Sequence, residues 1–249
     1  MSDALTLTGR CLRLSRRNVE ALITSLMLPV MLMLLFVYLF GGAIRTDSRY
    51  VDYVVPGVIV LCVGFGASVT AISVTEDMKR GVVDRFRSLD VSGAAMLSGH
   101  VAASLVRNAV STVLVLGVAV LIGFRPAQAP SRWLATAGVL LVFAAAMSWL
   151  AAVVGLFAGS PEAANGFTFF ISFLPYASSA FVPVETMPQW LHGFAGNQPY
   201  TPMIEAVRAL LNGTSVGSSV WVALAWWTGV LLFSVVASRL LFARRTSAQ

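Results

Sequence analysis

Long apolar runs separated by short polar segments make up most of the chain. Six of these runs have roughly 20 residues, the length that a helix needs to cross a hydrocarbon core of about 30 Å. The predicted spans cover residues 22–43, 54–75, 105–124, 133–158, 166–182 and 220–242. Strands of an outer-membrane barrel would instead alternate apolar and polar residues. The pattern therefore predicts an all-α integral membrane protein with six transmembrane helices in a single domain, residues 1–249.

The distribution of basic residues predicts which side of the membrane each loop faces. Short cytoplasmic loops carry the excess of Lys and Arg. If the N-terminus lies inside, the cytoplasmic basic residues are Arg10, Arg13, Arg16, Arg17, Lys79, Arg80, Arg85, Arg87, Arg239, Arg244 and Arg245. The outer ones are then Arg45, Arg49, Arg125, Arg132 and Arg208, and Arg107 falls within the third span. We therefore expect both termini in the cytoplasm.

The loop between the second and third spans carries an unusual concentration of charge, in residues 76–90. At helical spacing, Val82, Phe86 and Leu89 share one face, and Arg80, Asp84 and Arg87 share the opposite one. Such a helix can press its apolar face into a groove on a cytosolic partner. It can also lie on the lipid surface, and the pattern alone does not separate the two.

Short amphipathic helices are also predicted before the first span and after the fifth. Leu7, Cys11 and Leu14 share a face beside arginines, which predicts an interfacial helix on the inner leaflet that anchors the chain or contacts a cytosolic partner. Residues 184–219 contain an apolar face that predicts one short helix, and Thr201 as N-cap and Gly213 at the end bracket a second. Both helices are expected to dip into the outer leaflet. Glu205 and Arg208 are predicted to pair there, either structurally or as an extracellular gate.

The composition argues against several classes of protein and of functional site. Hydrophobic residues make up 57% of the chain and charged residues 11%, which is far from a soluble domain. The net charge of +6 reflects topology and anionic lipid, and no nucleic-acid partner is expected. All 11 acidic residues fall in loops or at span ends, so the sequence offers no proton relay at membrane depth. No metal-binding pattern is present.

A nucleotide site is not expected on this chain. A P-loop requires a lysine after glycine, and Lys79, the only lysine, is followed by Arg80. We therefore expect no enzymatic activity of the chain itself. A protein with several spans, no ion relay and a large charged cytoplasmic loop is typical of the membrane half of a machine whose energy comes from a separate subunit.

Several residue blocks resemble one family. Residues 76–89, with Gly-Val-Val-Asp-Arg-Phe-Arg-Ser-Leu at 81–89, resemble the first cytoplasmic loop of the permease subunits of type-2 ABC exporters, in particular the daunorubicin-resistance kind. The blocks at residues 160–165, 181–191 and 198–202 resemble that family's fifth span and extracellular connection, and Pro29 and residues 40–42 also match. The sequence departs from the family pattern at Asp90, where proline is usual, and at Gly93 and His100, where basic residues are common.

The resemblance implies a partner and a set of coupling residues. Two copies of the permease would pair, as a homodimer, with two copies of a separate ATP-binding subunit that holds ATP and Mg, and this chain would hold no cofactor. The loop between spans two and three would be a coupling helix resting on the ATPase. The residues expected to couple to the ATPase are Glu76, Arg80, Asp84, Arg85, Phe86, Arg87 and, in a secondary contact, Glu162. The location implied is a bacterial cell membrane.

An aromatic, uncharged wall is predicted for the substrate path between the two copies. Its residues are Phe65, Phe169, Phe170, Phe173, Tyr176 and Phe181. Such a wall suits hydrophobic drugs or lipids, although lipid-facing aromatic residues give the same pattern. The function indicated is multidrug efflux by an exporter, with two alternatives left open: a permease for lipids or glycoconjugates, and a membrane assembly subunit that transports nothing.

Two features inside the spans each have two interpretations. Gly155 and Gly159 form a Gly-x-x-x-Gly pair that favours close helix packing, within the bundle or against a second copy. Arg107 is predicted near the inner interface, where its side chain reaches the headgroups or contacts substrate.

Overall fold

The computed structural model describes residue 9 and residues 19–44, 46, 48–80, 93–127 and 129–247, and all of its regular elements are helical within those ranges. The long helices are α2 (Val19–Leu35), α3 (Tyr50–Lys79), α5 (Gly93–Leu121), α6 (Pro130–Phe157) and α10 (Ser219–Ser247). Shorter ones are the π-helical η1 (Phe36–Phe40), α7 (Pro161–Phe173), the 3₁₀ turns η2 (Leu174–Ala177) and η3 (Val184–Thr186), α8 (Gln189–Asn197) and α9 (Tyr200–Asn212).

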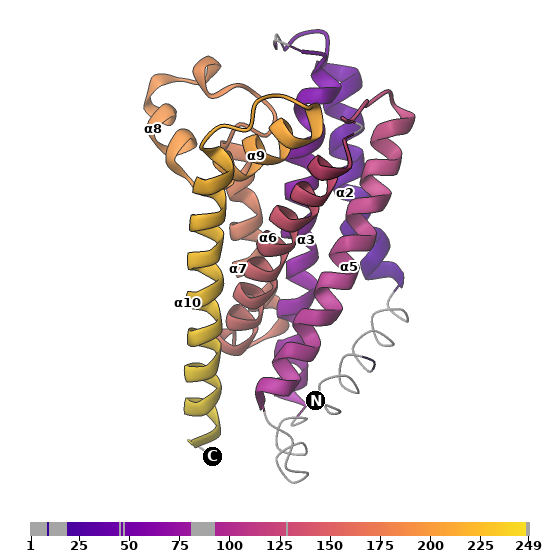
Figure 1. Ribbon diagram of the computed structural model, residues 1–249. Coiled ribbons are helices and arrows are strands. Elements are labelled where there is room, and N and C mark those ends of the chain that lie inside the picture. The colour runs from indigo at the N-terminus through magenta and orange to yellow at the C-terminus, as the bar shows by residue number, and fades with distance from the viewer. Residues whose placement is uncertain are drawn as a thin grey trace.

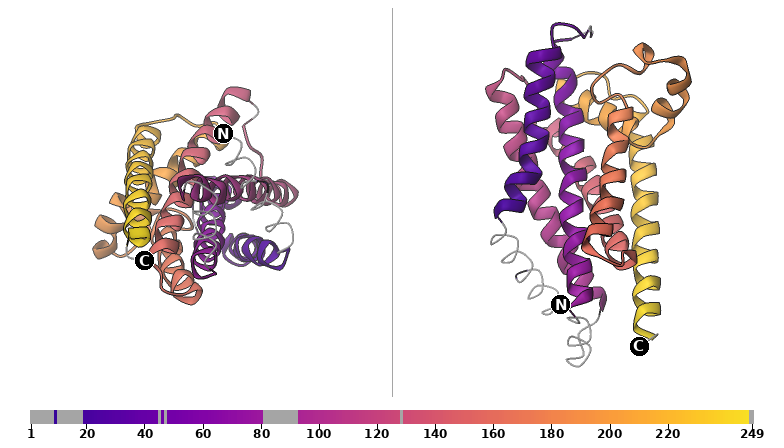
Figure 2. Two further views of the ribbon diagram at one scale, coloured as in Figure 1. Left: turned by 90° about the horizontal axis from the view of Figure 1, so that it is seen from below. Right: turned by 180° about the vertical axis from the view of Figure 1, so that it is seen from behind.

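The long helices form a bundle around α3 (Figures 1 and 2). Helix α3 packs against α2, α5, α6, α7 and α9, while α10 packs against α6 and α9 on the outside. Most of the first two-thirds of α3 is buried. The short helices α8 and α9 gather at one end of the bundle, here named the α9 end (Figure 1). The last residues of α3 and of α10 lie at the opposite end, here named the Lys79 end.

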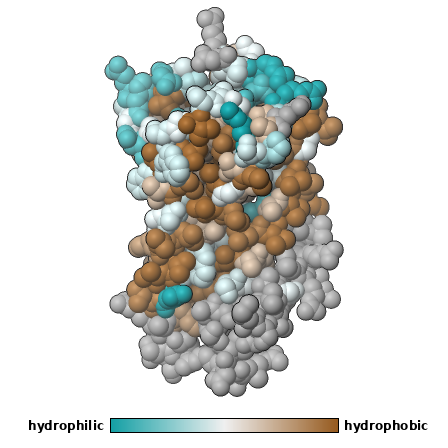
Figure 3. All heavy atoms as spheres, viewed as in Figure 1, coloured by the Kyte–Doolittle hydropathy of each residue, from teal (hydrophilic) through white to brown (hydrophobic). Residues whose placement is uncertain are grey.

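Four of the described helices are long and apolar enough to cross a membrane, namely α3, α5, α6 and α10. On the face shown in Figure 3, apolar side chains cover the middle of the molecule and hydrophilic ones collect at the α9 end. Large exposed apolar side chains on α5 and α10 include Val113, Leu121, Trp221 and Phe233. A bundle with an apolar belt of this kind is a multi-pass membrane protein.

The four long spans were predicted, with ends that differ. Helix α5 begins at Gly93, well before the predicted start at 105, because small and polar residues such as Ser98, Gly99 and His100 interrupt the apolar pattern of its first turns. The first predicted span corresponds to α2 with η1, whose described apolar part, Met27–Phe40, is shorter than a full span. The count of six spans and the cytoplasmic position of both termini stay predictions.

The fifth predicted span is interrupted. Helix α7 ends at Phe173, and the chain continues as a 3₁₀ turn over Leu174–Ala177 and then as turns up to Val182. Pro175 explains the break, since it offers no backbone N–H to continue the helix. The Ser178 hydroxyl donates a hydrogen bond to the Pro175 carbonyl oxygen and holds the turn. The predicted single helix over 166–182 is therefore wrong in its second half.

The two short helices predicted after the fifth span are present as α8 and α9. Trp190 and Phe194 on α8 are exposed, as expected of a helix that dips into a leaflet. Gly213 ends α9 in the left-handed conformation, with φ of 76°. The predicted N-cap is wrong, because α9 begins at Tyr200 and the Thr201 hydroxyl donates instead to the carbonyl oxygen of Ala195 on α8.

Gly155 allows α6 to approach α3 closely. A Cβ added at Gly155 would lie 2.6 Å from the Ala71 carbonyl oxygen and 2.8 Å from Val74 Cβ. The Thr75 hydroxyl donates to the Gly155 carbonyl oxygen at 3.0 Å across the same contact. Gly155 therefore packs within the bundle, whereas Gly159 lies beyond the end of α6 and has no atom near its Cβ position.

Replacing Gly155 with alanine should destabilise the protein by about 1–3 kcal/mol, because the new methyl group meets backbone atoms that cannot move independently. Gly138→Ala is the matched control, since Gly138 lies in α6 and has nothing within 4 Å of its Cβ position. Alanine there should raise stability by about 0.5–1 kcal/mol. Thermal unfolding in detergent measures both, and equal melting temperatures for the two variants would contradict the close contact.

Candidate functional site

The Lys79 end carries the described part of the predicted coupling set. Arg80 Nη2 lies 3.3 Å from Glu76 Oε2, and both side chains are largely exposed. An exposed pair of this kind contributes little stability, so both charges remain accessible to a partner. Asp84, Arg85, Phe86 and Arg87 lie outside the described residues.

Glu162 lies in the first turn of α7, close to that charged end. The Ser160 hydroxyl caps the helix by accepting a hydrogen bond from the Ala163 amide at 3.1 Å. Hydrogen bonds from Ser160 and from its own backbone lower the pKa of the Glu162 carboxyl, and Lys79 lowers it further. The carboxylate is therefore ionised and exposed at the same end as Glu76 and Arg80, as the predicted secondary contact requires.

A buried polar pair that the sequence analysis did not single out joins α3 to α5 near the Lys79 end. His100 Nε2 lies 3.0 Å from Asp77 Oδ2, and the two side chains are only 7% and 8% exposed. Asp77 lies near the end of α3 and His100 near the start of α5. The pair therefore ties together the two helices that residues 81–92 connect.

Deeper in the bundle, Arg107 joins α5 to α3. Its Nη2 donates a hydrogen bond to the Thr70 hydroxyl at 2.9 Å. Arg107 is central in α5, with fourteen residues on either side of it between Gly93 and Leu121. The neighbouring Asn108 is buried, and neither polar atom of its amide has a hydrogen-bond partner. Arg107 thus makes an interhelical contact with α3, and its predicted position near the inner interface stays a prediction.

Aromatic rings form a row from α7 to η1. The centroids of Phe169 and Phe173 lie 5.3 Å apart, those of Phe173 and Tyr176 5.0 Å, and those of Tyr176 and Phe181 5.6 Å. Such distances are typical of packed aromatic pairs. The structure thus brings together four of the six residues predicted for the substrate path.

The row continues into the first helix. Phe181 stacks on Phe36 at 4.2 Å, and Phe36 contacts Phe40 at 5.3 Å. Sequence reasoning missed these two phenylalanines, although their spacing of four residues places them on one helix face. Phe169, Phe173 and Phe40 are exposed, whereas Phe181 is buried. The row therefore joins two surface patches through the core.

Phe65 and Phe170 do not belong to this row. Phe170 points away from the core with 77% of its side chain exposed. Phe65 is only partly buried against the main core. Within the part of the chain that the structure describes, neither ring contacts another aromatic ring of the row.

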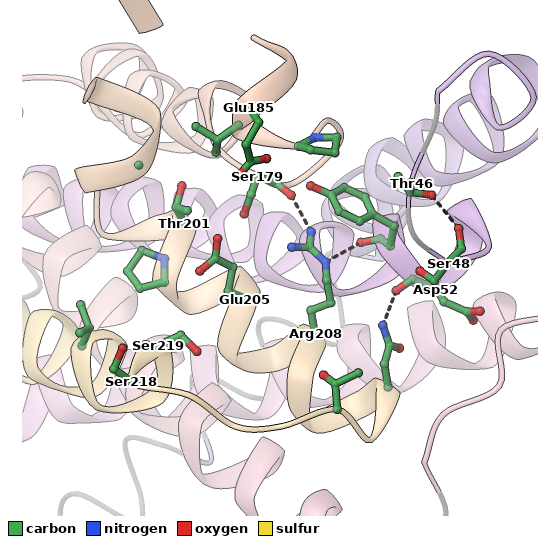
Figure 4. Close-up of a pocket in the computed structure, with 18 of the residues that line it drawn as sticks. Thr46, Ser48, Asp52, Ser179, Glu185, Thr201, Glu205, Arg208, Ser218 and Ser219 are labelled. Carbon is green, nitrogen blue, oxygen red and sulfur yellow. Dashed lines mark hydrogen bonds between the residues drawn. The ribbon is translucent and has the colours of Figure 1, made fainter. Parts of the chain in front are cut away.

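A polar hollow of about 1220 Å³ opens at the α9 end (Figure 4). Its wall is built mainly from the start of α3, Ser179 with residues 183–186, the end of α8, α9 and the start of α10. Glu185, Glu205 and Arg208 line it, so the predicted gate residues do meet there (Figure 4). We refer to this feature as the α9 hollow.

Arg208 is held by backbone oxygens rather than by Glu205. Its Nε donates to the Tyr53 carbonyl oxygen at 3.1 Å, and its Nη2 donates to the Ser179 carbonyl oxygen at 2.5 Å. The guanidinium carbon also lies 3.9 Å from the centre of the Tyr53 ring, within the range of a cation–π contact. The predicted ion pair is therefore wrong: spacing along the helix favoured it, but distant carbonyl groups compete for the guanidinium.

Glu205 forms no ion pair with an arginine or lysine of the described residues. Its side chain reaches the open space, but protein atoms surround it on other sides, and this desolvation raises the pKa of the Glu205 carboxyl. Arg208 lowers that pKa and Glu185 raises it. Asp52, in contrast, is bound by both Nε and Nη2 of Arg49, at 2.9 and 3.1 Å.

Replacing Arg208 with lysine should lower the free energy of unfolding by about 1–3 kcal/mol, since one ammonium group cannot bond both carbonyl oxygens and cover the Tyr53 ring. Arg125→Lys is the control, because Arg125 lines the same hollow but is exposed, and it should change stability by no more than about 0.5 kcal/mol. Unfolding followed by tryptophan fluorescence measures both. An R208K protein as stable as R125K would rule out the bridging role.

Comparison with known proteins places these features in a family context. The family model described as ABC-2 type transporter matches residues 3–212. The chain is 32% identical over 220 residues to the daunorubicin resistance ABC transporter permease protein DrrB1 of Streptomyces coeruleorubidus, covering 86% of this chain and 77% of that protein. It is 24% identical over 238 residues to the probable doxorubicin resistance ABC transporter permease protein DrrC of Mycobacterium tuberculosis, covering 95% and 86%.

Proposed function

The chain belongs to the ABC-2 type transporter family, and we propose that it is the permease subunit of an ATP-driven exporter that moves a hydrophobic, drug-like substrate out of the cell. The permease character itself follows from the family and from the apolar helical bundle. The proposal adds the substrate class, the export direction and the partner. The names of the relatives, which refer to daunorubicin and doxorubicin resistance, support a drug-like substrate.

The observation that carries the substrate class is the aromatic row. It runs from exposed rings on α7 to the exposed ring of Phe40 on η1 and includes no charged residue. Aromatic walls bind flat apolar molecules through stacking and apolar contact. In the proposed homodimer the exposed parts of the row face the second copy, and the substrate passes along them.

The energy is proposed to come from a separate ATP-binding subunit, two copies of which hold ATP and Mg. Three charged residues support a docking place for it at the Lys79 end: the exposed Glu76, Arg80 and Glu162. The charged loop at residues 81–90 would complete this surface as the coupling helix, with both termini of the permease on the same cytoplasmic side. Closure of the ATPases then shifts the population between inward-facing and outward-facing states.

The coupling proposal is tested on the permease co-purified in lipid nanodiscs with its proposed ATP-binding subunit, which is sought among the neighbouring genes. Replacing Phe86 with aspartate should abolish the stimulation of ATP hydrolysis by hydrophobic drugs, because a carboxylate cannot enter an apolar groove. Phe86→Leu keeps an apolar side chain and should retain most of the stimulation. Full stimulation in F86D would overturn the coupling role, and failure of the two subunits to form a complex would overturn the assigned partner.

The substrate path is tested with Phe173→Ala. Loss of the ring should raise the concentration of a flat aromatic drug that gives half-maximal stimulation of ATP hydrolysis, roughly 2- to 10-fold. This change corresponds to the roughly 0.5–1.5 kcal/mol of an aromatic contact. Phe170→Ala is the matched control, since Phe170 lies on the same helix but outside the row. Equal effects of the two substitutions would show that the row is not the path, and a complex that ignores every drug would point to a lipid or glycan cargo.

A further inference from the structure

Polar side chains form a row along the buried face of α5. His100, Ser104 and Asn108 follow one another at intervals of four residues, and all three are buried. Thr112, which is partly buried, continues the same spacing. Four residues are close to one helical turn, so these side chains lie above one another on one face of the helix. The row therefore repeats itself at each turn of α5.

Helix α3 faces this row at successive levels. The His100 ring contacts the Asp77 carboxylate near the Lys79 end, at 3.0 Å. Further from that end, Asn108 lies against Gly66, so closely that a Cβ added to the glycine would overlap the Asn108 amide oxygen. Thr70 lies on α3 between these two levels, one turn from Gly66. The two helices are thus antiparallel, with polar groups of α3 at several levels of the row.

The Asn108 side chain is not satisfied in this arrangement. It is 2% exposed, yet neither its oxygen nor its nitrogen has a hydrogen-bond partner among the described residues. A buried polar group without a partner is costly, and a low local dielectric raises that cost. Gly66, the residue opposite, has no side chain to offer. The Thr70 hydroxyl lies one turn closer to the Lys79 end, just out of reach of the amide.

We propose that α5 has a second register on α3, displaced by one helical turn, about 5.4 Å, toward the Lys79 end. The arrangement in this structure is named the first register. In the second register Asn108 lies beside Thr70, and the amide bonds the hydroxyl. Ser104 takes the place of His100 beside Asp77, and its hydroxyl donates to the carboxylate.

The other contacts of the row also have a counterpart after the shift. Thr112 replaces Asn108 against Gly66, where its shorter side chain fits. Ser148 of α6, which contacts Ser104 at 2.9 Å in the first register, also bonds the Ala144 carbonyl oxygen and keeps that bond. No buried hydroxyl of these residues is left without a partner by the displacement.

Arg107 would exchange one hydroxyl for another. In the first register its Nη2 donates to the Thr70 hydroxyl at 2.9 Å. A shift of one turn brings it to the level of Ser73, which is partly buried on α3. The Ser73 hydroxyl donates to the Val69 carbonyl oxygen at 2.8 Å, so its own oxygen can still accept a bond from a guanidinium.

The surroundings of α5 permit a lengthwise displacement. In its most apolar stretch 22% of the residues are buried, against 67% in α3, and side chains such as Val110 and Val113 are exposed. Side chains that face lipid tails keep an equivalent environment when the helix slides. After α5 the chain turns at Gly123, with φ of 104° and no atom within 4 Å of its Cβ position. This connection has room to follow the helix.

The test measures the separation of spin labels on α3 and α5 by double electron–electron resonance, on the permease alone in lipid nanodiscs. Lys79→Cys and Leu121→Cys carry the labels, since both positions are exposed. Cys11 is replaced by serine, and Cys62 is buried and stays unlabelled. Labelled chains are co-reconstituted with an excess of unlabelled ones. Two separations that differ by about 5 Å are expected, and the shorter one belongs to the second register.

Substitutions in the row should change the populations in opposite directions. His100→Ala removes a contact of the first register alone, so the fraction with the shorter separation should rise roughly 10-fold or more. His100→Gln keeps a neutral hydrogen-bonding side chain and should give a smaller rise. Adding Asn108→Leu to His100→Ala removes the amide that the second register satisfies, and the fraction should fall again. Asn165→Leu, the same replacement at an exposed position of α7, is the control and should change nothing.

Three results would each overturn the second register. These are a single separation in both H100A and H100Q, an equal short fraction in H100A and H100A/N108L, and a change of the populations in N165L as large as that caused by N108L. Thermal unfolding verifies that each variant is folded, and H100Q takes the place of H100A if the latter is not. The inference goes beyond the proposed function, because the measurement requires neither the ATPase nor a drug.

Discussion

Buried backbone carbonyl groups outside regular helices need hydrogen-bond donors, and this requirement governs the α9 end. The chain leaves helical geometry after Phe173, so the following carbonyl oxygens lose their regular partners. Side chains of other elements supply the donors: the Tyr50 hydroxyl bonds the Phe181 oxygen at 2.9 Å, Arg208 bonds that of Ser179, and Gln198 bonds that of Ala177. An irregular segment is stable in this position because α3, α9 and Gln198, the residue that follows α8, provide side-chain donors for it. The same construction creates the α9 hollow.

The fold was predictable where burial is uniform and less so where it changes along a helix. The apolar runs predicted α3, α5, α6 and α10, because a span must be apolar over most of its length. The extension of α5 back to Gly93 was missed because hydropathy marks the apolar part of a helix, and the helix itself can continue beyond that part. The break at Pro175 was readable in principle, but an apolar run through it suggested continuity. The contact of Gly155 with Ala71 and Val74 depends on how two helices cross, which a single sequence does not specify.

The residues of the candidate sites also differ in how well they could be predicted from the sequence. Residues selected for their own chemistry, such as Arg80 and the aromatic residues Phe169 and Phe173 of α7, are exposed, and their roles stay predictions. Predictions that rested on the spacing of residues along one helix were less reliable. Glu205 and Arg208 are three apart, yet the guanidinium bonds groups 155 and 29 residues away. The pairing of Asp77 with His100 also has no local signal, since it appears only when α3 and α5 lie side by side.

Helix α3 connects the two ends of the bundle. At the Lys79 end it carries Glu76 and the buried Asp77, which is held by His100. At the α9 end its Tyr53 oxygen accepts a bond from Arg208, and Gly57 lies so close to Ala180 that an added Cβ would be 2.7 Å from the Ala180 oxygen. A helix of 30 residues is about 45 Å long and, when packed on several sides, moves as a unit rather than bending freely. A shift of α3 driven at the Lys79 end would therefore strain the contacts of Arg208, which lines the α9 hollow, and those of the turn at Ala180 beside it.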